Sequence, residues 1–129
     1  FFHLEFFRKP GGELIALEVN VRPPGGPILD MYNYACDVDL YWGFANTVMN
    51  NRFIDHYSRK YYCCYVSRKY NKSYVHSHDA VMAAFNPLVI QHEPMPSIFS
   101  LAMGDYAYIL RTPDYDEMLA AADFIQEMA

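Results

Sequence analysis

The chain opens with two alternating segments on either side of a glycine pair: Phe2-His3-Leu4-Glu5-Phe6-Phe7, then Gly11-Gly12, then Leu17-Glu18-Val19-Asn20-Val21-Arg22. Apolar and polar residues that alternate around a Gly-Gly pair predict a β-hairpin. A two-residue loop at Gly11-Gly12 fixes the register of this hairpin by counting outward from the loop. The expected facing pairs are Pro10 and Glu13, Glu5 and Glu18, Leu4 and Val19, and His3 and Asn20.

The predicted hairpin has one polar and one apolar face, because side chains alternate along a strand and facing residues share a side. The polar face would contain His3, Glu5, Glu18, Asn20 and Arg22. The apolar face would contain Phe2, Leu4, Phe6, Leu17, Val19 and Val21. We expect the apolar face to pack in a core and the polar face to carry the chemistry.

Two carboxylates, Glu5 and Glu18, meet across the predicted ladder. Like charges in this position destabilise a sheet by a few tenths of a kcal/mol to about 1 kcal/mol, so a compensating cation is expected. Mg²⁺ prefers oxygen ligands and is commonly held by one or two carboxylates together with substrate phosphates. Glu5, Glu18 and the amide oxygen of Asn20 could supply such ligands, and Arg22 could bind a phosphate or carboxylate through its guanidinium fork.

The acidic first strand, the short turn, the Glu18-x-Asn20-x-Arg22 strand and the continuation Pro23-Pro24-Gly25-Gly26 resemble the metal-binding hairpin of ATP-grasp enzymes. This family includes biotin carboxylase and carboxylate-amine ligases. The segment Asp37-Val38-Asp39-Leu40 follows in the family order. The resemblance implies that Glu5, Glu18 and Asn20 hold the Mg²⁺ (or Mn²⁺) of bound ATP. It also implies that Arg22 steadies an acyl phosphate or the attacking substrate, and it gives His3 no fixed role.

By this resemblance the chain is the C-terminal part of a longer ATP-dependent ligase that activates a carboxylate for attack by an amine or related nucleophile. The expected partner is an N-terminal ATP-grasp lobe of the same longer chain, which brings a lysine and a glycine-rich loop to the nucleotide. The isolated chain is expected to be inactive. Three alternatives stay open: a bicarbonate-using carboxylase, a noncatalytic interaction module that retains the hairpin, and an ordinary hairpin with a solvated polar face.

Composition is compatible with this interpretation. The chain has 129 residues, of which 53% are hydrophobic, and this length is sufficient for a sizeable core. A net charge of −5 disfavours nucleic acid as a partner. Cys36, Cys63 and Cys64 form no spaced framework and predict free thiols in the cytoplasm. No apolar stretch reaches the roughly 18 residues of a spanning helix and no leader is evident, so no membrane partner is expected, while a homodimer is left open.

Downstream of the hairpin, the sequence predicts an alternation of helices and strands. Helices are expected over 29–35, from an N-cap at Asp37 or Asp39 to about Met49, from His78-Asp79 to Phe85, and after an Asp114–Glu117 capping box with Met118, Ala121, Ala122 and Ile125 on one face. Strands are expected over 61–67, 88–92 and 104–111.

The expected fold class is therefore α+β: the C-terminal part of the ATP-grasp fold, with an antiparallel hairpin and a small mixed sheet packed with helices. Residues 1–52 would be the end of the catalytic domain, and residues 53–129 a small α+β lobe.

The other residues that could carry chemistry have simpler interpretations. Cys63-Cys64 with His76-x-His78 lacks the spacing of a zinc site and favours a strand and loop. His56 and His92 are expected to be surface or hydrogen-bonded residues, and Arg59-Lys60 and Arg68-Lys69 a solvated edge.

Overall fold

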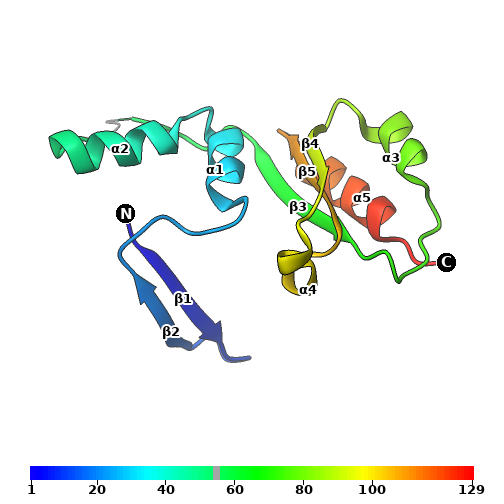
Figure 1. Ribbon diagram of the computed structural model, residues 1–129, viewed down its shortest axis with the longest axis horizontal. Coiled ribbons are helices and arrows are strands. Elements are labelled where there is room, and N and C mark those ends of the chain that lie inside the picture. Colours follow the sequence, from blue (N-terminus) through cyan, green and yellow to red (C-terminus); the bar gives the residue numbers. More distant parts are fainter. Residues whose placement is uncertain (54–55) are drawn as a thin grey trace.

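The computed structural model describes residues 1–53 and 56–129. Figure 1 shows an extended arrangement, with the N-terminal hairpin and α2 at one end, a small lobe at the other, and α1 between them. The elements, in chain order, are β1 His3–Arg8, β2 Leu14–Asn20, α1 Ile28–Cys36, α2 Leu40–Asn50, β3 Tyr62–Arg68, α3 His78–Phe85, β4 Val89–Pro94, the 3₁₀ turn η1 Ser97–Phe99, α4 Ser100–Met103, β5 Tyr106–Thr112 and α5 Tyr115–Gln126.

The predicted α+β class is confirmed, but the prediction of a mixed sheet is wrong. The described strands form a two-stranded sheet, β1-β2, and a three-stranded sheet of order β3-β5-β4, and every pairing is antiparallel. Because β5 lies between β3 and β4 and is antiparallel to both, β3 and β4 run parallel to each other, and the segment that connects them includes α3. No helix in the described ranges is long and apolar enough to cross a membrane.

The main core lies on one face of the three-stranded sheet. Leu110 of β5, Val81 of α3 and Ile125 of α5 are completely buried there. Val66 of β3, Tyr108 of β5 and Ala121 of α5 complete the core. Because directly paired residues of neighbouring strands share a face of the sheet, Val66 and its pairing partner Tyr108 point to the same side, toward α3 and α5.

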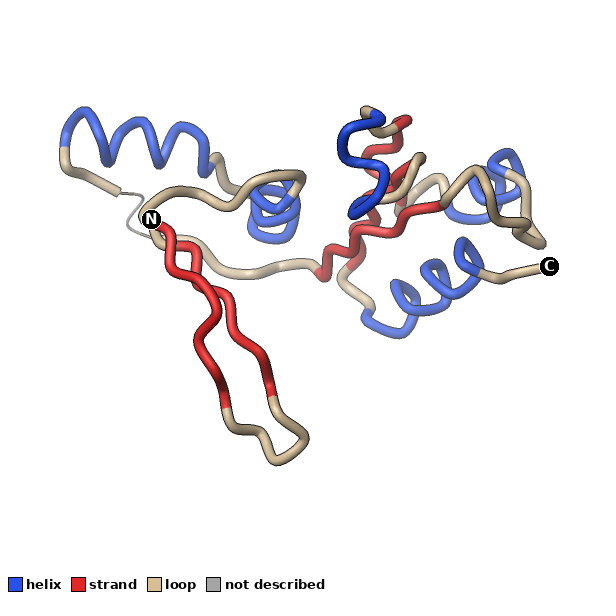
Figure 2. Tube along the Cα trace, turned by 60° about the horizontal axis from the view of Figure 1, so that its bottom comes forward, coloured by secondary structure: helices blue, strands red, loops and turns tan. Residues whose placement is uncertain are grey.

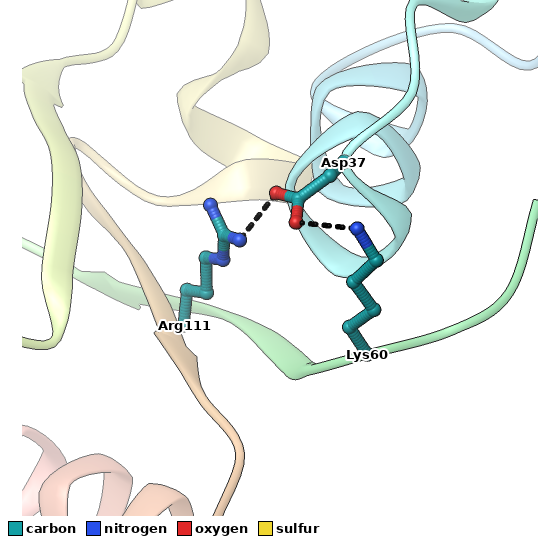
Figure 3. Close-up of polar contacts among 3 residues, drawn as sticks. All are labelled: Asp37, Lys60 and Arg111. Carbon is teal, nitrogen blue, oxygen red and sulfur yellow. Dashed lines mark hydrogen bonds and ion pairs between the residues drawn. The ribbon is translucent and has the colours of Figure 1, made fainter.

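Helix α1 joins the other face of this sheet through polar contacts. The backbone N–H groups of Lys60 and Tyr61 both donate to the carbonyl oxygen of Ala35, at 2.9 and 3.0 Å. Asp37, which caps the C-terminal end of α1, lies between the side chains of Lys60 and Arg111, as Figure 3 shows. Tyr34 also donates from its hydroxyl to Oε1 of Gln91 at 3.0 Å. These bonds fix α1 against the lobe.

The predicted helices are confirmed, and most begin where a side chain caps them. Asp39 accepts from the backbone N–H of Trp42 at 2.9 Å, and α2 ends at Asn51, which has a left-handed φ of 51°. Asp114 accepts from the N–H groups of Asp116 and Glu117 at the start of α5. The cap of α3 is Ser77 rather than His78-Asp79, since its hydroxyl accepts from the N–H of Ala80 at 3.1 Å.

The sequence did not predict η1 and α4, which connect β4 to β5. Gly104 ends α4 with a φ of +82°, a conformation that favours glycine. It also lies against β3, because a Cβ at this position would be 2.6 Å from Oγ of Ser67. The predicted strand 104–111 therefore starts later, at Tyr106. The proposed division of the chain at residues 52 and 53 stays a prediction.

Candidate functional site: the carboxylate pair of the hairpin

The hairpin has the predicted register at the residues singled out for chemistry. Glu5 faces Glu18, Leu4 faces Val19 and His3 faces Asn20. The two carboxylate-bearing residues therefore share one face of the ladder, at the end distant from the loop. Figure 2 shows the hairpin projecting away from the helices, with its loop at the far end.

The predicted two-residue loop, in contrast, is wrong. The N–H of Lys9 donates to the carbonyl of Glu13 at 2.9 Å and that of Gly12 to Lys9 at 2.8 Å, which leaves a three-residue loop from Pro10 to Gly12. Gly12 has a φ of +86°, as this type of loop requires. The loop alone would put Glu5 opposite Leu17, but a bulge shifts the register between Glu5 and Phe6 and restores the Glu5–Glu18 pair.

Short polar contacts organise the candidate ligands. Nε2 of His3 lies 3.0 Å from Oε1 of Glu5. The side-chain amide of Asn20 donates from Nδ2 to Oε1 of Glu18. Because the NH₂ group is used in this bond, the amide oxygen of Asn20 stays an available acceptor. Nδ1 of His3 is buried and has no hydrogen-bond partner among the described residues.

The apolar face is not buried as predicted, and the polar face is only partly open. His3, Glu5 and Asn20 of the polar face are partly buried, whereas Glu18 is exposed. The apolar face is open: Phe2 is 72% exposed, Val19 62% and Val21 79%. The expectation of a core on this face is therefore wrong for this chain, since a two-stranded sheet offers no second layer of its own to cover it.

Arg22 lies outside the paired hairpin. Strand β2 ends at Asn20, so the strict alternation that placed Arg22 in the polar row does not continue to it. Its side chain is exposed, and Nη1 donates to the carbonyl oxygen of Pro23 at 3.0 Å. The remaining guanidinium nitrogens are thus left to bind other acceptors.

The donor set suits a hard divalent cation whose coordination is completed by other molecules. Glu5, Glu18 and Asn20 supply carboxylate and amide oxygens, the ligand type that Mg²⁺ prefers. Residues 1–53 and 56–129 contain no group of three or more His, Cys, Asp or Glu side chains that could hold a metal ion. An all-protein cage is therefore absent from these ranges, and an ion at the hairpin would need phosphates or water to complete its coordination.

An aromatic contact anchors the hairpin to the helices. The ring of Phe1 packs edge-on against Phe44 of α2 at 5.2 Å between centroids, and against Phe53 at 5.4 Å. Beside it lies an open, mainly apolar pocket of about 720 Å³, to which His3 and Leu4 of β1 contribute together with Leu29 of α1. His3, which contacts Glu5, thus lines this pocket, whereas Glu5, Glu18 and Asn20 do not.

A second pocket, of about 290 Å³, lies where the segment before α1 meets the sheet. Gly26 and Pro27 line one side, and Tyr65, Glu93 and Ile109 line the sheet side. Asp30 of α1 also reaches it and accepts from the hydroxyl of Tyr41 at 2.8 Å. Burial and this hydrogen bond raise the pKa of Tyr41 to about 12, so the phenol stays protonated and keeps donating. No sequence pattern predicted this pocket, because its walls come from segments far apart in the chain.

The vicinal cysteines are ordinary strand residues. Cys63 and Cys64 lie on β3, half-buried, with free thiols. Burial raises the pKa of Cys63 to about 11, with a smaller effect from Cys64, and burial also raises the pKa of Cys64. Such thiols are poor nucleophiles and poor metal ligands at neutral pH.

Among the histidines, His92 is hydrogen-bonded as expected, 2.7 Å from the Tyr106 hydroxyl, and His56 is exposed.

Comparisons of the chain with known proteins found no relative. No protein-family model matches the chain, and neither the curated proteins nor the solved structures include a match.

Proposed function

We propose that the chain is the C-terminal part of an ATP-grasp ligase, which activates a carboxylate as an acyl phosphate for attack by an amine or a related nucleophile. The observation that carries this proposal is the direct pairing of Glu5 with Glu18. Two carboxylates on one face of an otherwise open hairpin destabilise it unless a cation lies between them or beside them.

Glu5, Glu18 and Asn20 are the proposed ligands of Mg²⁺ or Mn²⁺, and their oxygens suit this role. An ion bound there would neutralise charge on the phosphates of ATP during phosphoryl transfer. His3 would orient Glu5 through its Nε2 contact of 3.0 Å. Arg22 would bind the anionic acyl phosphate or the carboxylate substrate through the guanidinium nitrogens that Pro23 does not use.

The pocket near Gly26 supports an amine as the second substrate. It opens beside the segment that follows Arg22 in the chain, and its walls are mostly apolar. Asp30 and Glu93 bring two carboxylates to its lining, and neither forms an ion pair with a described residue. An uncompensated negative charge in an apolar pocket favours a ligand with a cationic group.

The open apolar face of the hairpin supports the further expectation of an N-terminal lobe. Phe2, Val19 and Val21 are all largely exposed, and folded proteins usually cover a face that carries several large apolar side chains. In the proposed ligase the N-terminal lobe of the same longer chain covers this face and contributes the nucleotide-phosphate contacts.

The test is ADP release by the full-length protein that contains this chain, with Mg-ATP and pooled amino acids or other carboxylates. We expect substrate-dependent ADP release that Glu18→Gln abolishes, because the substitution removes charge but keeps shape. Glu13→Gln is the matched control, since Glu13 lies in the same hairpin but pairs with Lys9 at 2.9 Å.

A metal titration isolates the hairpin from the rest of the reaction. Mn²⁺ binding, followed by electron paramagnetic resonance, should weaken at least about tenfold in Glu18→Gln and stay unchanged in Glu13→Gln. No ADP release from a well-folded wild type, with no Mn²⁺ bound at the hairpin, would reject the ligase in favour of a noncatalytic module.

A further inference from the structure

The turn between β3 and α3 forms a pocket with an unusual concentration of positive charge. The pocket has a volume of about 270 Å³, and three of the ten Lys and Arg residues of the chain line it: Arg68, Lys69 and Lys72. Its remaining walls are tyrosines and His78, and no Asp or Glu is among the lining residues. The pocket is therefore positively charged, although the whole chain has a net charge of −5.

Arg68 is the buried base of this pocket. The sequence predicts a solvated arginine here, but only 9% of the residue is exposed. Its Nε donates to the carbonyl of Ile125 and its Nη1 to that of His76, both at 2.8 Å. The guanidinium also lies over the ring of Tyr74, 4.7 Å from the centroid, and 5.9 Å from that of Tyr108.

The charge of Arg68 is not balanced within the described residues. Nη2 is buried without a hydrogen-bond partner, and Arg68 forms no ion pair with a described carboxylate. A buried donor left unpaired costs about 1–3 kcal/mol, and more when the group is charged. Two carbonyl bonds explain why Arg68 holds the end of α5, but they leave its positive charge without a counter-charge.

The neighbouring cations are free to act with Arg68. Lys69 and Lys72 form no ion pair with residues 1–53 or 56–129, although Nζ of Lys69 donates to the carbonyl of Leu101 at 3.1 Å. The turn is fixed by the N–H of Lys72, which donates to the carbonyl of Lys69 at 3.1 Å. Asp105 accepts from the N–H of Tyr70 at 2.8 Å, but it does not line the pocket.

Polar ring atoms complete the wall. His78 contacts the hydroxyl of Tyr108 through Nδ1 at 2.9 Å, which leaves Nε2 as its second hydrogen-bonding atom. Tyr70 is exposed at the rim and Tyr106 lies deeper. Phosphate accepts several hydrogen bonds and carries up to two negative charges at neutral pH, which matches three cations and several O–H and N–H donors better than a monovalent anion does.

We propose that this pocket binds a small phosphate group, either free or as an organic phosphomonoester. The phosphate supplies the counter-charge that Arg68 lacks. Lys69, Lys72 and the hydroxyls of Tyr70 and Tyr74 provide direct contacts, since the hydroxyls of Tyr106 and Tyr108 are already paired with histidines. The site lies on the small lobe and shares no residue with the carboxylate pair of the hairpin, so it does not depend on the proposed ligase activity.

The test is a titration of the ¹⁵N-labelled chain with inorganic phosphate, at constant pH and ionic strength, monitored by amide chemical shifts. We expect saturable shifts centred on the β3–α3 turn and on Tyr106–Tyr108. Lys72→Met should weaken binding by about fivefold or more, the loss expected for one charge contact near a surface. Lys9→Met is the charge-matched control, because Lys9 lies in the hairpin turn and pairs with Glu13.

Shifts that sodium chloride reproduces at equal ionic strength, or equal weakening by Lys9→Met, would overturn the proposal. A second titration with phenyl phosphate identifies the source of the phosphate. Tighter binding than inorganic phosphate supports an organic phosphomonoester whose ring contacts the tyrosines, and equal binding supports free phosphate. Arg68 itself is not varied, because it also anchors α5.

Discussion

Arg111 on β5 forms an ion pair with Asp37, the residue that caps the C-terminal end of α1 (Figure 3). The two residues are 74 positions apart, so this contact joins the N-terminal half of the chain to the small lobe. Lys60 donates to the second carboxylate oxygen of Asp37 at 3.1 Å. The guanidinium of Arg111 also stacks 3.7 Å from the ring centroid of Tyr61, which fixes its position.

This contact predicts a pH dependence of stability. The Lys60 hydrogen bond lowers the pKa of Asp37 below 3.8, and Arg111 acts in the same direction, against partial desolvation. A carboxyl whose pKa is lower in the folded state stabilises the fold above its unfolded pKa and loses this contribution as the pH falls through its folded pKa. Asp37→Asn should therefore unfold at lower urea than wild type at about pH 6, and the difference should shrink below about pH 4.

Asp123→Asn is the control for this experiment, since Asp123 is exposed on α5 and forms no ion pair with the described residues. A difference between wild type and Asp37→Asn that stays constant down to about pH 3 would contradict the role of the carboxylate charge.

Gly104→Ala should destabilise the small lobe by about 1–3 kcal/mol, because a left-handed φ is strained for alanine and the new methyl group would meet β3. The added Cβ would be 2.6 Å from Oγ of Ser67 and 3.0 Å from the carbonyl oxygen of Arg68. Urea unfolding followed by circular dichroism measures the loss. Gly25→Ala is the matched control, since nothing lies within 4 Å of a Cβ at Gly25. Equal stability of the two variants would show that β3 accommodates the methyl group.

Ile125→Ala should cost about 2–5 kcal/mol, because it leaves a cavity between α5 and the sheet. Ile125 is completely buried, in the core that includes Val66 and Leu110. Leu101→Ala, at a position 88% exposed on α4, should change stability by no more than about 0.5 kcal/mol. Thermal unfolding of both variants tests the assignment of the core, which fails if the two substitutions have similar effects.

Glu18→Gln should stabilise the metal-free hairpin by up to about 1 kcal/mol, because it removes the like-charge pair with Glu5. Amide hydrogen exchange of β1 and β2 in the presence of a chelator measures this effect. Added Mg²⁺ should slow exchange in wild type and have little effect on the variant. Faster exchange in the metal-free variant would mean that the Glu18 carboxylate supports the hairpin through Asn20 rather than opposing it.

The sequence predicted the strands of the three-stranded sheet and the helices α1, α2, α3 and α5, because their signals are local. The side chains of Asp39 and Asp114 cap the first turns of α2 and α5, so each residue indicates where a helix begins. The spacing of Met118, Ala121 and Ile125 alone indicates which face of α5 is buried. What the sequence could not give was the burial of Arg68, since this depends on carbonyls of His76 and Ile125 that the fold brings to it.

The Glu5–Glu18 pair was predicted correctly from a loop that was one residue too short. The three-residue loop and the bulge at Leu17 each shift the register by one residue, in opposite directions, so the two deviations cancel beyond the bulge. Neither has a reliable sequence signal, since Gly11-Gly12 suits both loop lengths. Exposure of the apolar face was not predictable either, because strand alternation tells which residues share a face but not what covers it.

The bulge also makes the two edges of the hairpin unequal. β1 is regular from His3 to Arg8, so every second residue directs its N–H and C=O groups away from β2, whereas β2 carries the extra residue between Ala16 and Glu18. An incoming strand can pair continuously with the first edge, but on the second it must kink at the same point or break its ladder. A further strand would therefore pair with this sheet more readily along β1 than along β2.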